Sequence, residues 1–150
     1  MSRDELAHRE EEQGTLTYEV ITNEGSDRTN VWLTCAKHIF ATQLPKMPRE
    51  YIVRLLFDRK HYTMVLLKEQ KVVGGLCFRP NAVQRFAEIA FCAIDANEQV
   101  RGYGTRLMNH VKEYAKQCGL THFLTYVGWE RRERGRARRC DRGGRGEGAA

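Results

Sequence analysis

The residues of this chain with the clearest potential for chemistry lie in one short segment, Gln99–Thr105, which reads QVRGYGT. Its two glycines, Gly102 and Gly104, fall where an amphipathic helix is expected to begin. Glycine has no Cβ, so the backbone there can approach a ligand closely. The unpaired N–H groups and partial positive charge of a helix N-terminus favour a phosphate or pyrophosphate. We therefore interpret the segment as a phosphate-binding loop, while an ordinary tight turn has the same local pattern.

The helix after these glycines is predicted from apolar residues at helical spacing, with Gly119 as its C-terminal stop. The apolar positions are Leu107, Met108, Val111, Tyr114, Ala115 and Cys118. Spacing excludes two other phosphate loops. No Gly-Lys-Ser/Thr sequence follows, as a P-loop requires, and Leu107 stands where a dinucleotide-binding fingerprint has its third glycine.

Upstream, the apolar segment Phe86–Ile94 contains a single carboxylate, Glu88. Such a run predicts a strand that is covered on both faces. Because side chains alternate along a strand, Glu88 is expected to share its face with apolar residues only: Phe86, Ala90, Cys92 and Ile94. Desolvation would make this carboxylate a stronger base, as a general base acting on a lysine ammonium requires. A solvated glutamate at a strand end is the alternative that residue type alone leaves open.

The glutamate and the glycine loop belong to a longer pattern. It is carried by five segments: 43–52, 74–80, 86–94, 97–110 and 120–126. Together they closely resemble the PCAF-type histone acetyltransferases of the GNAT superfamily, over about residues 16–126. The resemblance implies a mixed α/β fold, with a mixed central sheet flanked by helices. It also implies direct transfer of acetyl from acetyl-CoA to a histone-tail lysine, in the manner of a transcription coactivator.

The resemblance assigns a role to each candidate site residue. Glu88 matches the general base, which takes a proton from the substrate lysine through a water. The N–H of Cys92 matches the donor to the thioester oxygen, where negative charge develops in the transition state. The strand that pairs with the pantetheine arm is matched by Cys92, Ala93 and Ile94. The loop that holds the pyrophosphate is matched by Gln99, Val100, Arg101, Gly102, Tyr103, Gly104 and Thr105.

We expect three parts along the chain: an acidic disordered lead at 1–13, the GNAT domain at 14–127, and an Arg/Gly-rich disordered tail at 128–150. Within the domain, strands are predicted at 16–22, 62–67, 72–78, 86–94 and 122–127, and helices at 30–43, about 50–56 and after the glycine loop. The inner face of the first of these helices is predicted to hold Val31, Cys35, Ile39 and Phe40.

The resemblance ends directly after Tyr126, where the family continues with one more helix and two strands. We expect the domain to lack these elements, which supply one wall of the peptide groove and part of the acetyl-CoA pocket. Residues 127–150 instead hold eight arginines and four acidic residues. The alternative function is a non-catalytic truncated variant that binds acetyl-CoA weakly, or nucleic acid through this basic tail. The narrow tail composition also suits a variant transcript or a gene-model artefact.

Composition sets the broad class. The chain has 150 residues, of which 41% are hydrophobic, and this suits one domain. No run approaches the roughly 20 apolar residues of a membrane span. Five cysteines without a Cys-x-x-Cys pair, and histidines without ligand spacing, favour reduced thiols and predict no metal. We expect an intracellular protein with no membrane partner. The resemblance implies a nuclear location, histone tails as substrates and a multisubunit coactivator complex for the full-length form.

Overall fold

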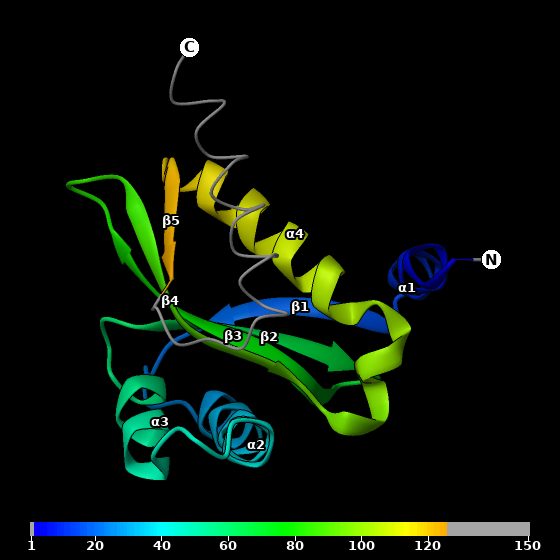
Figure 1. The fold of residues 1–150 in the computed structure, drawn as a ribbon, viewed down its shortest axis with the longest axis horizontal. Helices are drawn as coiled ribbons and strands as arrows, with labels where there is room; N and C mark the ends of the chain where they lie inside the picture. Colours follow the sequence, from blue (N-terminus) through cyan, green and yellow to red (C-terminus); the bar gives the residue numbers. More distant parts are fainter. Residues whose placement is uncertain (1, 126–150) are drawn as a thin grey trace.

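A five-stranded sheet in the order β1-β2-β3-β4-β5 is covered by helices on both faces (Figure 1). The computed structural model describes residues 2–125, and for Val100 and Thr125 it describes the backbone alone. In chain order the elements are α1 (Arg3–Glu12), β1 (Leu16–Ile21), α2 (Asp27–Gln43), α3 (Arg49–Leu56), β2 (Tyr62–Lys68), β3 (Lys71–Asn81), β4 (Phe86–Ile94), the 3-10 helix η1 (Ala96–Arg101), α4 (Tyr103–Gln117) and β5 (His122–Thr125).

The sheet is mixed, as the sequence predicts. Strands β1 to β4 pair antiparallel with their neighbours, and β5 pairs parallel with β4. A two-residue turn joins β2 to β3, and both its residues, Glu69 and Gln70, have positive φ angles of 52° and 68°. Such turns match the twist of the flanking strands. The mixed α/β fold class is thereby confirmed, together with the predicted order of strands and helices from β1 to β5.

Helices α2 and α3 lie on one face of the sheet, and α4 lies on the other (Figure 1). On the α2 face, Phe40 packs edge-to-face on Phe91 of β4, with ring centroids 4.7 Å apart. On the α4 face, Tyr114 makes the same kind of contact with Phe78 of β3 at 5.9 Å. Burial on both faces explains why the central strands read as nearly continuous apolar runs.

The buried face of α2 differs from the predicted one. The helix begins at Asp27, because the Oγ of Ser26 accepts a hydrogen bond from the N–H of Thr29 at 3.3 Å. Val31 is 60% exposed, and Cys35 is exposed as well. The face that includes the large apolar side chains of Trp32 and Leu33 turns toward the sheet instead. The buried residues of α2 are Thr29, Trp32, Leu33, Ala36 and Phe40. Of the predicted inner residues only Phe40 is fully buried.

The N-terminal segment is a helix, and the expectation of a disordered lead is wrong for residues 3–12. Ser2 and Glu5 form a capping box, in which the Ser2 Oγ accepts from the Glu5 N–H at 3.2 Å and the Glu5 carboxylate accepts from the Ser2 N–H at 2.6 Å. Ala7 is fully buried. The helix lacks an apolar stripe, so periodicity did not reveal it, and its carboxylates pair with Arg106 and His110 of α4 and with Arg101 of η1.

Two predictions extend past the described residues. Strand β5 is described from His122 to Thr125, so the last two predicted positions, 126 and 127, lie outside it. The Arg/Gly-rich tail at 128–150 also lies outside the described part of the chain, so the alternative in which this tail binds nucleic acid stays a hypothesis. Within residues 2–125, no helix is long and apolar enough to cross a membrane.

Candidate active site

Glu88 of β4 borders a cavity of about 200 Å³ between the sheet and α3. The glutamate is half-buried. Since a water molecule occupies about 30 Å³ in the liquid, the cavity can hold several waters or the end of a long side chain. Its lining residues are Tyr51, Arg54, Leu55, His61, Arg79, Glu88 and Ala90. The structure therefore places the predicted carboxylate beside a space where a substrate group could reach it.

The surroundings of Glu88 are more polar than the sequence predicted. Arg79 of β3 lies directly opposite Glu88 in the antiparallel register, and Arg54 and His61 line the same cavity. The Nδ1 of His61 lies 2.8 Å from Oδ2 of Asp58, and this contact, with the Lys60 N–H, holds the pKa of Asp58 below its usual range. The expectation of purely apolar neighbours is wrong, because α3 and the segment before β2 bring these groups from elsewhere in the chain.

A β-bulge in β4 changes which residues share a face with Glu88. Phe78 lies opposite Ile89, and Cys77 lies opposite Phe91, so Ala90 is an extra residue in the strand. Both Glu88 and Ala90 line the cavity beside α3, and the next residue, Phe91, packs on α2 on the same side of the sheet. The alternation therefore reverses at Ala90. As a result, the prediction that Cys92 and Ile94 share the face of Glu88 is wrong.

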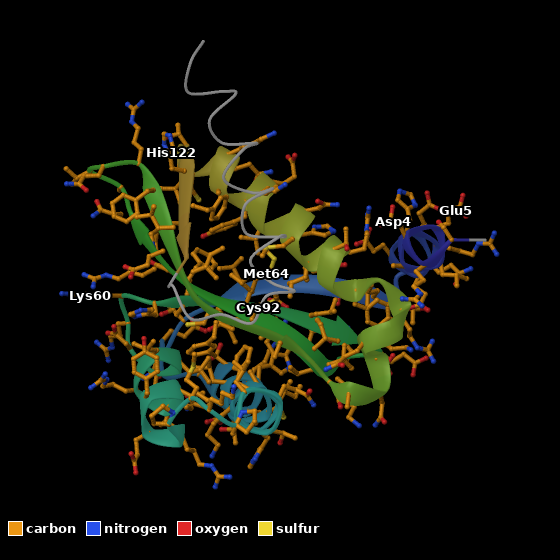
Figure 2. The ribbon with its side chains drawn as sticks, viewed as in Figure 1. Asp4, Glu5, Lys60, Met64, Cys92 and His122 are labelled. Carbon is orange, nitrogen blue, oxygen red and sulfur yellow. The ribbon has the colours of Figure 1, made fainter. Side chains whose placement is uncertain are left out.

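The predicted carrier-binding segment lies beyond the point where β5 pairs with β4. In the described part of the chain, that parallel register runs from Phe86 opposite His122 to Ile89 opposite Thr125. Residues 92–94 follow after this register ends, near the middle of the sheet where Figure 2 labels Cys92. The arrangement separates the two halves of β4: the first half lies beside β5 and carries Glu88, and the second half leads to the glycine loop.

The close approach of β3 to this second half of β4 depends on a glycine. A Cβ on Gly74 would lie 2.5 Å from Cδ1 of Ile94 and 2.9 Å from the carbonyl oxygen of Ala93. Contacts this short do not occur for real Cβ atoms, so a larger residue would push the two strands apart. Gly74 therefore sets the position of the Ala93–Ile94 backbone.

The glycine loop has the geometry that the sequence predicts. Residues 96–101 form η1, an element that was not predicted, and Gly102 then adopts a left-handed conformation with φ of +78°. Helix α4 begins at the next residue, Tyr103. Because Gly102 has no side chain, it cannot cap the N–H groups of the first turn. The N–H groups of its first turn therefore form a helix N-terminus of the kind that binds anions.

Two loop side chains hold η1 in place. The Gln99 amide donates to the carbonyl oxygen of Ile94 at 3.0 Å and to the side-chain oxygen of Gln43 at 2.8 Å. The Nε of Arg101 lies 2.9 Å from the Glu98 carboxylate, and the Arg101 guanidinium remains about half exposed. Gln99 thus ties the loop to the end of β4, while Arg101 stays at the surface near the α4 N-terminus.

Tyr103 is a packing residue, because its side chain is fully buried. Its hydroxyl donates to the carboxylate of Glu10 in α1. Burial, followed by this hydrogen bond, raises the pKa of Tyr103 above its usual range. Of the two sequence interpretations of Tyr103, ligand contact and packing, the structure supports packing for the side chain.

Sequence reasoning missed the contribution of α1 to this region. Glu11 accepts a hydrogen bond from Nε of Arg106 at 3.2 Å and one from Nη2 of the same guanidinium, and its carboxylate lies 2.8 Å from Nε2 of His110. Burial alone would raise the pKa of Glu11, but the hydrogen bonds from Arg106, the nearby hydroxyl of Tyr18 and the contact with His110 lower it to about 2. The one sequence signal for this helix was the Ser2-x-x-Glu5 capping pattern.

The described residues show no group of His, Cys, Asp or Glu side chains arranged to hold a metal ion. A mixed sheet whose fourth strand leads into a glycine loop at a helix N-terminus defines the class of domain that acetyltransferases use. The chain belongs to the acetyltransferase (GNAT) family, whose model matches residues 23–139.

Histone acetyltransferases named GCN5 are similar to the chain in sequence. The one from Oryza sativa subsp. japonica is 56% identical over 127 residues, which are 84% of this chain and 25% of the relative. The one from Yarrowia lipolytica is 52% identical over 120 residues, which are 79% of this chain and 26% of the relative. The chain therefore spans about a quarter of the length of these curated relatives.

Solved structures of the Tetrahymena protein GCN5 are similar in fold. One crystal structure matches with a TM-score of 0.77 and 50% identity, covering 81% of this chain and 77% of the other. The Tetrahymena catalytic domain in complex with coenzyme A matches with a TM-score of 0.64 and 55% identity, covering 75% of this chain and 68% of the other. An aminoglycoside acetyltransferase, at 21% identity and a TM-score of 0.64, shows the fold alone.

Proposed function

We propose that this domain is a histone lysine N-acetyltransferase that transfers acetyl from acetyl-CoA directly to a histone-tail lysine. One observation carries the proposal: β4 leads from Glu88, at the wall of a cavity, through residues 92–94 and η1 to the N-terminus of α4. Because Ala90 is an extra residue, the segment from Glu88 to Cys92 spans only three residues of the partner strand, from Arg79 to Leu76, which is about 10 Å at the usual rise of a strand. The histone acetyltransferases among its relatives support the choice of substrate.

Glu88 is proposed as the general base. Free lysine titrates near pH ~10.4, so its amine is almost wholly protonated at neutral pH and cannot attack a thioester. The Glu88 carboxylate would accept one proton from the ammonium through a cavity water. The neutral amine then forms a bond to the thioester carbonyl carbon, and the C–S bond breaks as the thiolate of coenzyme A leaves and takes up the second proton of the amine. Glu88 afterwards releases its proton to solvent. We assign the backbone N–H of Cys92, on the family resemblance, to the oxygen where negative charge develops.

The glycine loop is proposed to bind the pyrophosphate of acetyl-CoA. The loop residues fit this role because Gly102 is left-handed, η1 ends beside it and the first turn of α4 follows at once. Backbone N–H groups of residues 103–105 would donate to the phosphate oxygens. Arg101 adds a cation at the surface, and Ala93 and Ile94 would bind the pantetheine arm with Cys92. The Tetrahymena complex with coenzyme A supports this assignment.

We also infer a chromatin role for the full-length protein. Its relatives bear the name histone acetyltransferase, which suits a nuclear transcription regulator that works within a multisubunit coactivator complex. The chain itself would supply the acetyl-CoA site and the base.

The proposal is tested with Glu88→Gln, which keeps the shape of the side chain and removes the base. Purified protein is assayed with acetyl-CoA and peptides from the core histone tails, and we expect kcat to fall by about 100-fold or more. Glu50→Gln is the matched control, because Glu50 is exposed on α3 near the cavity. Calorimetry should show equal affinity of both variants for coenzyme A.

Three outcomes distinguish the possibilities. Equal turnover by the wild type and Glu88→Gln contradicts the assignment of the base. Binding of coenzyme A without turnover by the wild type favours the non-catalytic alternative. Absence of coenzyme A binding by a folded wild type overturns the carrier site altogether.

A further inference from the structure

We propose that α1 positions the coenzyme-phosphate loop, and that Glu11 is the positioning residue, acting through Arg106. The inference rests on the proposed function, since it concerns the loop assigned to the pyrophosphate. In the structure, α1 lies beside the N-terminal turns of α4, on the side where Figure 2 labels Asp4 and Glu5. The two helices are joined through side chains that are 93 or more positions apart in the sequence.

The first contact is between backbones. A Cβ on Gly102 would lie 3.0 Å from the carbonyl oxygen of Arg3 and 3.1 Å from its carbonyl carbon. Gly102, the left-handed residue that immediately precedes α4, thus packs directly against the first residue of α1. A shift of α1 would therefore be transmitted to the point where the anion-binding N–H groups begin.

The second contact is the Glu11 cluster. Glu11 and Arg106 have side chains that are only 15% and 17% exposed, and the guanidinium binds both carboxylate oxygens. His110, one turn further along α4, contacts the same carboxylate at 2.8 Å. Its ring stacks on Tyr18 of β1, with centroids 3.7 Å apart. Glu11 therefore holds the first two turns of α4 against α1 and β1.

The third set of contacts consists of a hydrogen bond and ion pairs on either side of the loop. Glu10 accepts the hydrogen bond from the buried Tyr103 hydroxyl, and its carboxylate lies 3.8 Å from Nη1 of Arg101. On the other side, Glu98 of η1 binds both Arg101 at 2.9 Å and Lys68 of β2 at 3.3 Å. Arg101 and Lys68, two cations near the loop, are thus already paired with carboxylates of the protein. Binding of a phosphate must therefore rely strongly on the direction of the backbone N–H groups.

Helix α1 could affect coenzyme A binding through its charge or through the position it gives to α4, and its net negative charge makes these two mechanisms distinguishable. The helix carries five carboxylates and two arginines, so its field opposes a phosphate at the nearby loop. If α1 acted by charge, removing the Glu11 charge would strengthen binding of coenzyme A. If α1 acts by position, the same change would weaken binding, because α4 loses its attachment. The two mechanisms thus predict opposite signs.

The test compares Glu11→Gln with Glu12→Gln on the same helix. The Glu12 side chain is 68% exposed, and its ion-pair partner within the described residues is the exposed His8. Calorimetry with coenzyme A as the probe should show a Kd raised on the order of tenfold for Glu11→Gln, and no change for Glu12→Gln. Equal or tighter binding by Glu11→Gln overturns the inference. Glu11→Asp, which keeps the charge, should recover part of the affinity.

Hydrogen exchange supplies a readout that does not depend on activity. Glu11→Gln should speed the exchange of amides at residues 102–106 while β2 and β3 stay protected, and Glu12→Gln should match the wild type. Unchanged exchange at 102–106 contradicts the inference. Should Glu11→Gln fail to fold, Arg106→Lys tests the same attachment. A wild type that binds no coenzyme A refutes the proposed function, whereas the exchange result still decides whether α1 positions the loop.

Discussion

Arg79 of β3 lies directly opposite Glu88 of β4, and both residues line the cavity beside α3. Directly opposite residues in an antiparallel pair have Cβ atoms about 5 Å apart. A cation therefore accompanies the carboxylate that we propose as the base, at the strand position where the sequence predicted apolar neighbours. This relationship leads to the first prediction.

Replacing Arg79 with Gln should lower kcat by up to about tenfold, because Glu88 loses the cross-strand partner that favours its orientation along the cavity wall. Stability should fall by only ~0.2–1 kcal/mol, the range for exposed cross-strand pairs. Steady-state kinetics with acetyl-CoA and a histone-tail peptide, together with urea denaturation, measure the two effects. Lys71→Gln is the control, since Lys71 is an exposed cation at the far end of the same strand. Equal kinetics for the two variants would show that Arg79 does not orient the base.

Two left-handed glycines provide the second prediction, a matched pair of alanine substitutions. Gly102 and Gly119 have almost the same φ, +78° and +77°, but Gly119 has open space around its Cβ position and Gly102 faces Arg3. Gly119→Ala should cost about 1–2 kcal/mol from backbone strain alone. Gly102→Ala should cost more, because the same strain is joined by a clash with the α1 backbone, and it should also weaken coenzyme A binding.

Thermal unfolding and calorimetry on both variants check this prediction. A loss of coenzyme A affinity that is as large in Gly119→Ala as in Gly102→Ala would argue against a local effect at the loop. Equal destabilisation of the two would show that the α1 backbone moves away at little cost.

The third prediction concerns acid stability. The pKa of Glu11 is about 2 in the folded protein, below its ordinary value of 4.5, so the folded state binds this proton less readily than the unfolded state. The stabilisation is fully present above pH ~4.5 and is lost as the pH falls toward 2. Its upper size is about 3 kcal/mol, by linkage.

Urea denaturation of the wild type and Glu11→Gln between pH 6 and 2.5 measures the contribution of the Glu11 carboxylate to the free energy of unfolding. The difference in the free energy of unfolding should be largest near pH 6 and should shrink as the pH falls. A constant difference across the range would mean that the Glu11 carboxylate is not the group that titrates.

Local sequence features predicted the loop and the central strands well. Gly102 and Gly104 marked the start of α4 because a left-handed residue before a helix is a local requirement of the backbone. The apolar run at Phe86–Ile94 was predicted with the observed bounds, since burial on both faces leaves a continuous apolar pattern. In contrast, the inner face of α2 was predicted one step around the helix, because several apolar stripes competed and the sheet selected among them.

The sequence by itself determined the order of strands and helices, the glycine-started helix and the position of Glu88 in β4, because each depends on neighbouring residues in the chain. Only the tertiary structure decided what surrounds Glu88 and what holds the loop. The bulge at Ala90 reverses the alternation of side chains, and Arg54 reaches the cavity from α3. Carboxylates of α1 accept hydrogen bonds from residues of α4 that lie about 95 positions away in the sequence. Charge pairs between distant segments leave no periodic pattern in a sequence, so they become visible only when the chain is folded.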